Sequence, residues 1–161
     1  MGKKQDKTNV MRLLEQKKIS YKEYTFECDG TWTGEEIATA MSQNPNQAFK
    51  TLVTVGATKK NYVFVIPVNR ELNLKKAAKA VGEKNIEMIK AKELLPLTGY
   101  VHGGCSPIGM KKQFTTVIND TANDFDTIIF SGGKIGYQVE VGLEDLKNIL
   151  PFEFGDVVCE K

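Results

Sequence analysis

The stretch from Gly103 to Lys112, GGCSPIGMKK, constrains the fold of this chain most strongly. Three glycines and a proline fall within its first seven residues, a density that no helix accepts and that would interrupt a strand. The stretch therefore predicts a tight loop whose backbone comes close to another group. Because glycines leave amide N–H groups uncovered, such a loop can hold a carboxylate, a phosphate or a developing oxyanion. A plain hairpin or Ω-loop is the alternative that composition leaves open.

A second informative stretch is AFKTLV, from Ala48 to Val53. Lys50 stands there among the apolar residues of a predicted buried strand, so we expect its ammonium group at the mouth of that strand. Lysines in such places commonly extend their charged end to water. If Lys50 has a function, its side chain acts as a partly desolvated point charge.

The rest of the chain predicts an α/β order without internal repeats. Helices are expected at residues 9–18, after Thr33, at 74–81, as a turn at 92–95 that Pro96 stops, and at 143–150. Thr8 or Asn9 can cap the first helix, Thr33 with Glu36 matches a capping box, and Asn73 and Gly82 are expected to bound the helix at 74–81. Strands are expected at 20–27, 51–58, 61–68, 86–89, 115–119, 127–131 and 137–141. Because strands outnumber helices and their connections are short, the pattern predicts a mixed, partly closed sheet with helices outside.

Length and composition place further bounds on the protein. With 161 residues and 41% hydrophobic content, the chain is expected to form one compact domain. The longest apolar run, residues 62–68, is too short to cross a bilayer, and the lysine-rich start, residues 1–7, lacks the apolar segment of a secretory signal. We therefore expect a cytoplasmic protein with a flexible basic N-terminus at residues 1–7.

The net charge of +2 gives no global field of the kind that dedicated nucleic-acid binders carry. The lysines nevertheless occur in pairs, which suit contacts with phosphates that do not depend on base sequence. A solvated surface explains most of these pairs equally well. If RNA is bound, its backbone should supply much of the affinity, and salt should weaken the binding.

Several common catalytic motifs are missing from the sequence. There is one histidine, and no cysteine has zinc-ligand spacing, so no metal site is predicted. Residues 131–136, SGGKIG, complete neither a Walker A nor a dinucleotide pattern, and Ser106 does not lie in a GxSxG elbow. Cys105 lies inside the glycine loop, three residues from His102, but this proximity alone does not predict a nucleophile. The sequence thus predicts neither a metal ion nor a cofactor.

Three ordered motifs, FKTLV, GYVHGGCSPIG and SGGKIG followed by a strand and LEDLKNIL, resemble the YbaK/EbsC-type aminoacyl-tRNA deacylases. They are also similar to the editing insertion domain of bacterial prolyl-tRNA synthetases. The resemblance runs from about Val10 to Asp156 and implies a single YbaK-like domain over residues 1–161, with a mixed or barrel-like sheet and flanking helices. It also implies hydrolysis of an aminoacyl ester without a strong nucleophile of the enzyme.

The resemblance assigns roles to residues at matching positions. Lys50 would contact the terminal ribose or its phosphate, and Gly103 and Gly104 would donate N–H groups to the ester carbonyl. The residues implied for substrate binding are Thr51, Ser106, Pro107, Ser131, Phe26 and Gln138, with Ser106 and Pro107 expected to shape the loop. Of these, Phe26 and Gln138 depart from the family pattern, which has a tyrosine and an acidic residue there, and Cys28 replaces a histidine. A general base therefore cannot be carried over.

Two hypotheses follow from the sequence. The first is an editing enzyme that hydrolyses mischarged aminoacyl-tRNA, most specifically Cys-tRNA(Pro), by binding its 3′ acceptor end. A complex with prolyl-tRNA synthetase and a preference for another small amino acid stay open. The second is a binding module that holds a nucleotide, an RNA 3′ end or a synthetase without turnover, a reading that the altered residues Phe26 and Gln138 favour.

Overall fold

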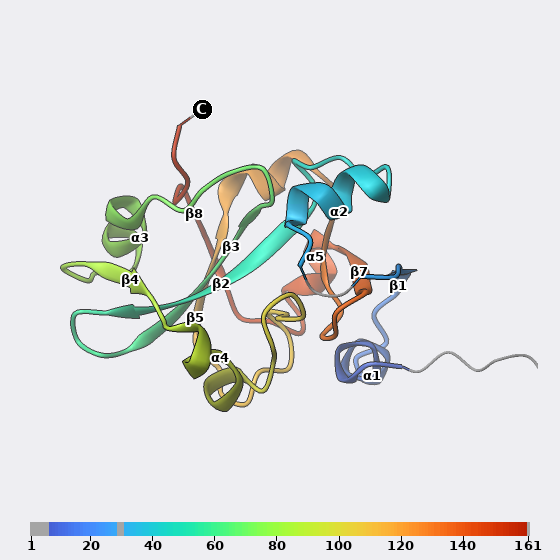
Figure 1. Ribbon diagram of the computed structural model, residues 1–161, viewed down its shortest axis with the longest axis horizontal. Helices are drawn as coiled ribbons and strands as arrows, with labels where there is room; N and C mark the ends of the chain where they lie inside the picture. Colours follow the sequence, from blue (N-terminus) through green and yellow to red (C-terminus); the bar gives the residue numbers. More distant parts are fainter. Residues whose placement is uncertain (1–6, 29–30, 161) are drawn as a thin grey trace, which may run out of the picture.

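The computed structural model describes residues 7–28 and 31–160 (Figure 1). Its helices are α1 (Asn9–Gln16), α2 (Gly34–Ala40), α3 (Leu74–Val81), α4 (Ala91–Thr98), α5 (Leu143–Leu146) and the 3₁₀ helix η1 (Asp120–Asp124). Its strands are β1 (Tyr21–Thr25), β2 (Phe49–Gly56), β3 (Asn61–Pro67), β4 (Ile86–Met88), β5 (Thr115–Asn119), β6 (Thr127–Ser131), β7 (Tyr137–Gly142) and β8 (Glu153–Gly155). The predicted mixed α/β fold with flanking helices is confirmed.

The strands form two sheets. The larger has the order β4-β2-β3-β5-β8, with β2 antiparallel to β3 and β4, and with β5 parallel to both β3 and β8. The smaller is antiparallel, with the order β1-β7-β6. A single parallel bridge between Ala48 and Ile129 connects them, and the Ile129 amide donates to the Gln47 carbonyl at 3.1 Å. The described strands are therefore partly closed and do not complete a barrel.

Alternation along β3 divides the hydrophobic core in two. Val63 and Val65 face the core that the larger sheet shares with the smaller sheet and α1. Tyr62, Phe64 and Ile66 face the opposite side, where they pack against α3. A strand buried on both faces is expected to be apolar, and β3 is apolar and buried after its first residue, Asn61. The two faces of the larger sheet are thus covered by different helices (Figure 1).

Local capping explains where the first three helices begin and end. The Thr8 hydroxyl accepts from the Met11 amide at 3.2 Å at the start of α1. At α2, Thr33 and Glu36 form the predicted capping box in both directions. At α3, the Asn73 side chain caps the first turn, and Gly82 ends the helix in the left-handed conformation with φ 75°. These predictions are confirmed because the signals lie within a few residues of each helix end.

Two expectations for individual elements were wrong, and two short elements were not predicted. Helix α4 continues through Pro96 to Thr98, because the Thr98 hydroxyl donates to the Leu94 carbonyl at 2.7 Å and the Gly99 amide to the Leu95 carbonyl at 2.8 Å. Helix α5 ends at Leu146, where bonds to the third preceding residue tighten the chain. The sequence also did not predict β8 and η1. Both are short, and β8 depends on pairing with β5, which is distant in the sequence.

Within the described residues, no helix is long and apolar enough to cross a membrane. The basic N-terminal segment expected to be flexible, residues 1–7, lies mostly outside the described part of the chain. Lys7, which is described, pairs with Glu15 at 2.7 Å.

Candidate functional site

A pocket of about 540 Å³ lies beside the first half of β2, near the point where the two sheets meet. Its wall contains residues from β2, from the segments around α2 and β4, and from both glycine-rich loops. Strand β4 pairs only with Thr54 to Gly56, and β6 reaches only Ala48. Among the described strands, none pairs with the same edge of β2 between these two points. The pocket therefore lies against an open strand edge.

The backbone of β2 presents polar groups to this edge. The Val68 amide donates to the Ala48 carbonyl at 2.9 Å, and the Ile89 amide donates to the Val53 carbonyl at 3.3 Å on the other side of the strand. Because hydrogen-bonding directions alternate along a strand, the N–H and C=O groups of Phe49 and Thr51 point away from β3. The parallel bridge between Ala48 and Ile129 takes up the Phe49 N–H group, which leaves the Phe49 carbonyl and both main-chain groups of Thr51 on the pocket side. A ligand in the pocket could pair with them.

Lys50 is the second residue of β2 and lines the pocket with a half-buried side chain. Burial lowers the pKa of Lys50 from its ordinary value, while the negative charges of Glu71 and Glu35 act in the opposite direction. The ion pairs between residues that the structure describes do not include Lys50. An ammonium group held in this way is a place for a ligand that carries negative charge.

Thr51 follows Lys50 and also lines the pocket. Its hydroxyl oxygen is buried and has no hydrogen-bond partner among the described residues. A buried hydroxyl without a partner costs free energy, of the order of 1–3 kcal/mol. A bound ligand or water that accepts or donates a hydrogen bond here would recover it.

Gly103, in the predicted loop, also lines the pocket. It occupies the third position of a β-turn that begins at Val101, and its φ of 87° is the value that a type II turn requires at that position. Glycine adopts this conformation without strain. The loop prediction is therefore confirmed, and Lys50, Thr51 and Gly103 lie around one cavity.

Gly104 does not line the pocket. Its amide donates to the Val101 carbonyl at 2.9 Å, which closes the turn, so it is not free to bind an ester carbonyl in this conformation. A methyl group at Gly104 would lie 3.0 Å from the main-chain nitrogen of Ile135 and 3.1 Å from the carbonyl carbon of Lys134. The geometry thus supports contact between the two glycine-rich loops as the role of Gly104, in place of the predicted donor role.

Ser106 and Pro107 also lie outside the pocket lining, because both are buried beneath the loop. The Ser106 hydroxyl accepts from the Ile108 amide at 3.3 Å. The Tyr100 hydroxyl donates to the Ile108 carbonyl at 2.6 Å. These bonds fix the loop from the side away from the pocket. Ser106 and Pro107 therefore shape the site without facing a ligand.

Ser131 and Gln138 face each other on β6 and β7, and both line the pocket. The Ser131 hydroxyl accepts from the Gly133 amide at 3.1 Å and so stabilises the turn after β6. Gln138 pairs with Gln43 through both amide groups, with the Gln43 nitrogen 2.8 Å from the Gln138 oxygen. Both side chains are thus fixed by the protein.

Phe26 lines the pocket together with Trp32. Their rings are stacked, with centroids 6.4 Å apart and an angle of 14° between planes. Trp32 is 39% exposed, so its ring also meets solvent at this side of the pocket. The Phe26 amide donates to the Gly136 carbonyl at 3.0 Å, which ties this aromatic pair to the second glycine-rich loop.

Cys105 and His102 also line the pocket. Burial raises the pKa of Cys105 to about 12, so its thiol stays protonated near neutral pH. The structure therefore gives no support to Cys105 as a nucleophile. Its side chain instead contributes to the shape of the cavity.

Sequence reasoning missed one wall of the pocket. The additional lining residues include Trp32, Ile37, Met88, Lys90, Leu94 and Tyr137. Trp32, the single tryptophan of the chain, was the one signal available. Met88, Lys90 and Leu94 have no motif around them, and only the packing of β4 and α4 beside β2 brings them to the site.

Comparison with known proteins assigns the fold and site to a family. A family model described as the aminoacyl-tRNA editing domain matches residues 29–149. The chain belongs to this family. The match spans β2, both glycine-rich loops and every predicted site residue except Phe26. The YbaK/EbsC resemblance is confirmed, and by family the chain is an aminoacyl-tRNA deacylase, a hydrolase.

A curated relative supports the same assignment. EbsC of Enterococcus faecalis (strain ATCC 700802 / V583), a candidate Cys-tRNA(Pro)/Cys-tRNA(Cys) deacylase, is 44% identical over 160 residues, which cover 99% of this chain and 98% of that protein. Such identity over nearly the whole length places the two proteins in one family.

Two solved structures are similar in fold. A candidate trans-editing enzyme for prolyl-tRNA synthetase has a TM-score of 0.79 at 22% identity and covers 96% of this chain and 100% of its own. The hypothetical protein APE2540 has a TM-score of 0.81 at 20% identity, with 93% and 99% covered. At this level of identity they show the fold alone.

Proposed function

We propose that this protein edits mischarged tRNA in trans by hydrolysing its aminoacyl ester, with Cys-tRNA(Pro) as the principal substrate. The observation that carries the proposal is the meeting of Lys50, Thr51 and Gly103 around one cavity of about 540 Å³. The ascribed activity of the relative from Enterococcus faecalis, at 44% identity, supports this choice of substrate. The proposed form is a single YbaK-like domain, residues 1–161, that acts in the cytoplasm.

In this proposal the protein positions an ester that is already labile. The acyl group enters the pocket, the open edge of β2 and the Gly103 turn hold its polar groups, and Lys50 faces the terminal ribose or its phosphate. Gly104 has a supporting role, because its amide is already bonded to Val101.

The nucleophile is proposed to come from the substrate. The thiol of the attached cysteine attacks its own carbonyl carbon, the bond from that carbon to the ribose oxygen breaks, and the thiol proton passes to the ribose oxygen. Water then opens the cyclic thioester to give free cysteine. Cys105 is no substitute for this nucleophile, because burial raises the pKa of its thiol to about 12.

The lining sets which acyl group is accepted. A pocket of fixed shape gains only about 1–3 kcal/mol per methylene, so small changes in lining shift the preference. Phe26 and Gln138 occupy positions at which the YbaK/EbsC family pattern has a tyrosine and an acidic residue. A preference for another small amino acid is therefore the second candidate. A non-catalytic module that binds an RNA 3′ end or a prolyl-tRNA synthetase is the third, since nothing in the lining is a strong nucleophile.

Single-turnover deacylation of a panel of labelled aminoacyl-tRNAs tests the proposal. The wild-type protein should release cysteine from Cys-tRNA(Pro) faster than it releases any other amino acid of the panel. Lys50→Ala should slow this release by about 100-fold or more, because the variant lacks the charged group that positions the reacting ester. The matched control is Lys75→Ala, on exposed helix α3 outside the pocket lining, which should retain wild-type rates.

Circular dichroism of both variants checks that they are folded. Release of another small amino acid in preference to cysteine would move the substrate to the second candidate. Binding of aminoacyl-tRNA without release of any amino acid would refute the enzyme and support the binding module.

A further inference from the structure

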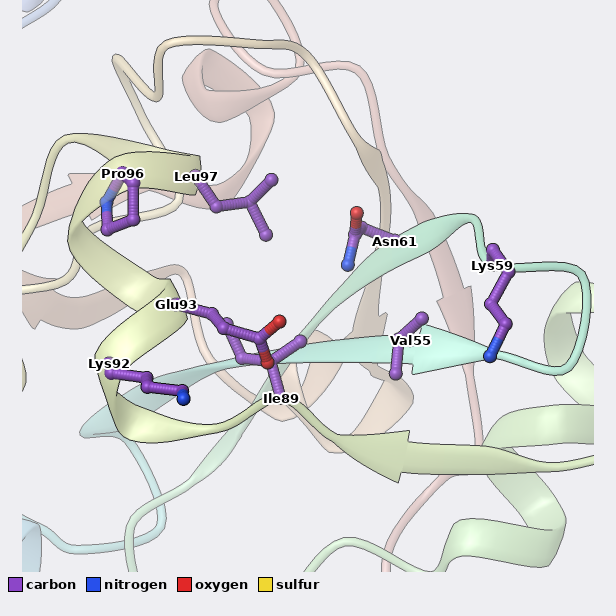
Figure 2. Close-up of a pocket in the computed structure, with 8 residues that line it drawn as sticks. All are labelled: Val55, Lys59, Asn61, Ile89, Lys92, Glu93, Pro96 and Leu97. Carbon is purple, nitrogen blue, oxygen red and sulfur yellow. The ribbon is translucent and has the colours of Figure 1, made fainter.

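A second hollow lies next to the site. It is an open groove of about 610 Å³ between the β2–β3 hairpin and α4 (Figure 2). Partly buried apolar side chains form much of its lining, from Val55, Ile89 and Leu97. Figure 2 shows Lys59 and Lys92 at opposite ends of this groove. The predicted site did not include any of these residues.

The two lysines carry free positive charge. Both are exposed, and neither takes part in the ion pairs found within residues 7–28 and 31–160. Lys59 lies in the hairpin turn with φ 75°, which fixes where its side chain leaves the backbone. Lys92 lies in the first turn of α4, where the helix dipole does not favour a positive charge. Neither charge is therefore explained by the fold.

Two of the acidic groups near the groove, Glu93 and Glu83, already have partners within the protein, and a third, the exposed Glu87, lies opposite Val55 on β4. Glu93, which lines the groove, accepts from the Lys90 amide at 2.9 Å. Glu83, near the hairpin turn, accepts from the hydroxyl groups of Thr58 and Tyr62. Both carboxylates are held in place by these bonds and do not pair with Lys59 or Lys92.

The groove adjoins the site pocket at Ile89 and the segment after it. Ile89 lines both cavities, and the segment that follows it places Lys90 in the pocket and Lys92 in the groove. A polymer whose end lies in the pocket can therefore leave it past Ile89 and enter the groove. Phosphates spaced along such a polymer would meet Lys90 first and then Lys92 and Lys59.

We propose that this groove binds the 3′-terminal strand of the tRNA, with Lys59 and Lys92 contacting its phosphates and the apolar floor receiving a base. The inference rests on the proposed function, because that function brings an RNA 3′ end into the adjoining pocket. Single-stranded nucleic acid is commonly bound by cations along the backbone and by aromatic side chains that stack on the bases. In this groove the aliphatic side chains of Val55, Ile89 and Leu97 would take the place of the aromatic ones. The lysines give affinity and register, not base specificity.

RNA binding measured by fluorescence anisotropy tests the groove independently of catalysis. The probe is a labelled hairpin RNA with a single-stranded CCA end, titrated with protein at several salt concentrations. The double variant Lys59→Gln with Lys92→Gln should bind on the order of 10-fold more weakly at 0.1 M salt. The slope of log affinity against log salt should fall by about 0.7 for each lysine, about 1.4 for both.

The matched control removes the same charge from the other side of the larger sheet. Lys75→Gln with Lys79→Gln, both exposed on α3, should leave the affinity and the salt slope as in the wild type. An equal loss of RNA affinity in both double variants would show a general effect of charge and would contradict the groove as the RNA site. RNA binding by the groove variant that equals wild-type binding would also contradict the groove as an RNA site. This holds even if the groove variant binds a synthetase more weakly.

A second readout separates the groove from the proposed function. Cysteinyl-adenosine carries the same ester without a phosphate chain. The groove variant should hydrolyse it at the wild-type rate while its KM for Cys-tRNA(Pro) rises. If the wild type hydrolyses neither substrate, the proposed function fails, and the anisotropy measurement still decides the groove. If catalysis holds but the groove variant shows wild-type KM on tRNA, the groove alone fails.

Discussion

At the scale of single residues, the site contains groups that the fold alone does not favour. Lys50 is half-buried without a partner carboxylate among the described residues, and the Thr51 hydroxyl is buried without a hydrogen bond. Unpaired polar groups of this kind reduce stability and are retained where a ligand pairs with them. Their position next to one another on β2 is the residue-level argument for a binding site.

Lys50→Met is expected to stabilise the protein at pH 7 while removing activity. Burial lowers the pKa of Lys50 below its ordinary value of 10.5. Between the folded and the unfolded pKa, the unfolded chain binds more protons, so the free energy of unfolding of the wild type rises with pH across that window. The cost of burying the charge is therefore fully present below the folded pKa. The advantage of Lys50→Met should shrink as pH rises toward 10.5.

Urea unfolding at pH 7 and at pH 10 measures this difference. The carboxylates of Glu71 and Glu35 oppose the effect and are unchanged in the variant. The control Lys75→Met, on exposed α3, should alter the free energy of unfolding by about 0.5 kcal/mol or less at either pH. A Lys50→Met protein that is less stable than the wild type at pH 7 would show that the ammonium group makes a favourable interaction in the folded state.

At the scale of elements, the pocket depends on the contact between two glycine-rich loops. Gly104 of the first loop packs against the backbone of Lys134 and Ile135 in the second. Gly136 of the second loop, with φ 88°, lies against the Phe26 carbonyl. The close approach of main chain to main chain explains why glycine is used at these points.

Gly104→Ala is expected to separate the loops and weaken the site. Its methyl group would lie 3.0 Å from backbone that cannot rotate away, and such overpacking costs about 1–3 kcal/mol. We expect a lower melting temperature and a reduced kcat/KM for deacylation. The control is Gly82→Ala, where φ is 75° and no atom lies within 4 Å. It should lose about 1–2 kcal/mol from backbone strain and keep its kcat/KM. Equal kcat/KM in both variants would contradict a role for the loop contact.

The elements that could be predicted from the sequence are those specified locally. The caps at Thr33 and Asn73 and the β2–β3 hairpin across residues 57–60 depend on neighbours within a few positions. Strand β8 could not be predicted, because its three residues pair with β5 across a long separation. The helical turn predicted at residues 92–95 was ended too early, at Pro96. The hydrogen bonds that continue α4 beyond it are made by Thr98 and Gly99.

The residues of the candidate site also divide into those that a local sequence pattern predicts and those that depend on packing. Lys50 and Gly103 could be found because each lies in a conspicuous segment, a charged residue in an apolar strand and a loop dense in glycine. The internal bonds of that loop could not be predicted, so Gly104 was expected to donate to the ligand although its amide is bonded to Val101. Ser106 and Pro107, expected to shape the loop, are buried within it. The wall formed by Met88 and Leu94 depends on how β4 and α4 pack, which no local pattern records.

At the scale of the whole molecule, α1 supports both loops from behind. Val10 lies against Gly133, where an added methyl group would come within 3.0 Å of its side chain, and Leu13 approaches Gly109 equally closely. The fully buried residues Met11 and Leu14 anchor the helix in the core shared by the two sheets. The N-terminal helix thus couples the stability of the fold to the position of the loops (Figure 1).

Leu14→Ala is expected to destabilise the protein by about 2–5 kcal/mol, because the removed atoms are fully buried and leave a cavity. The control Leu74→Ala, at a position 43% exposed at the start of α3, should cost about 1 kcal/mol or less. Guanidinium unfolding followed by circular dichroism measures both. A Leu14→Ala protein as stable as the control would contradict the placement of α1 in the core.

The most direct test of the site is a crystal structure with a substrate analogue that cannot be hydrolysed, 3′-deoxy-3′-(cysteinylamino)adenosine. The cysteinyl group should lie in the 540 Å³ pocket, between the open edge of β2 and Gly103, with the ribose facing the Lys50 ammonium group. An analogue that binds elsewhere on the protein and leaves Lys50 without contact would contradict the site.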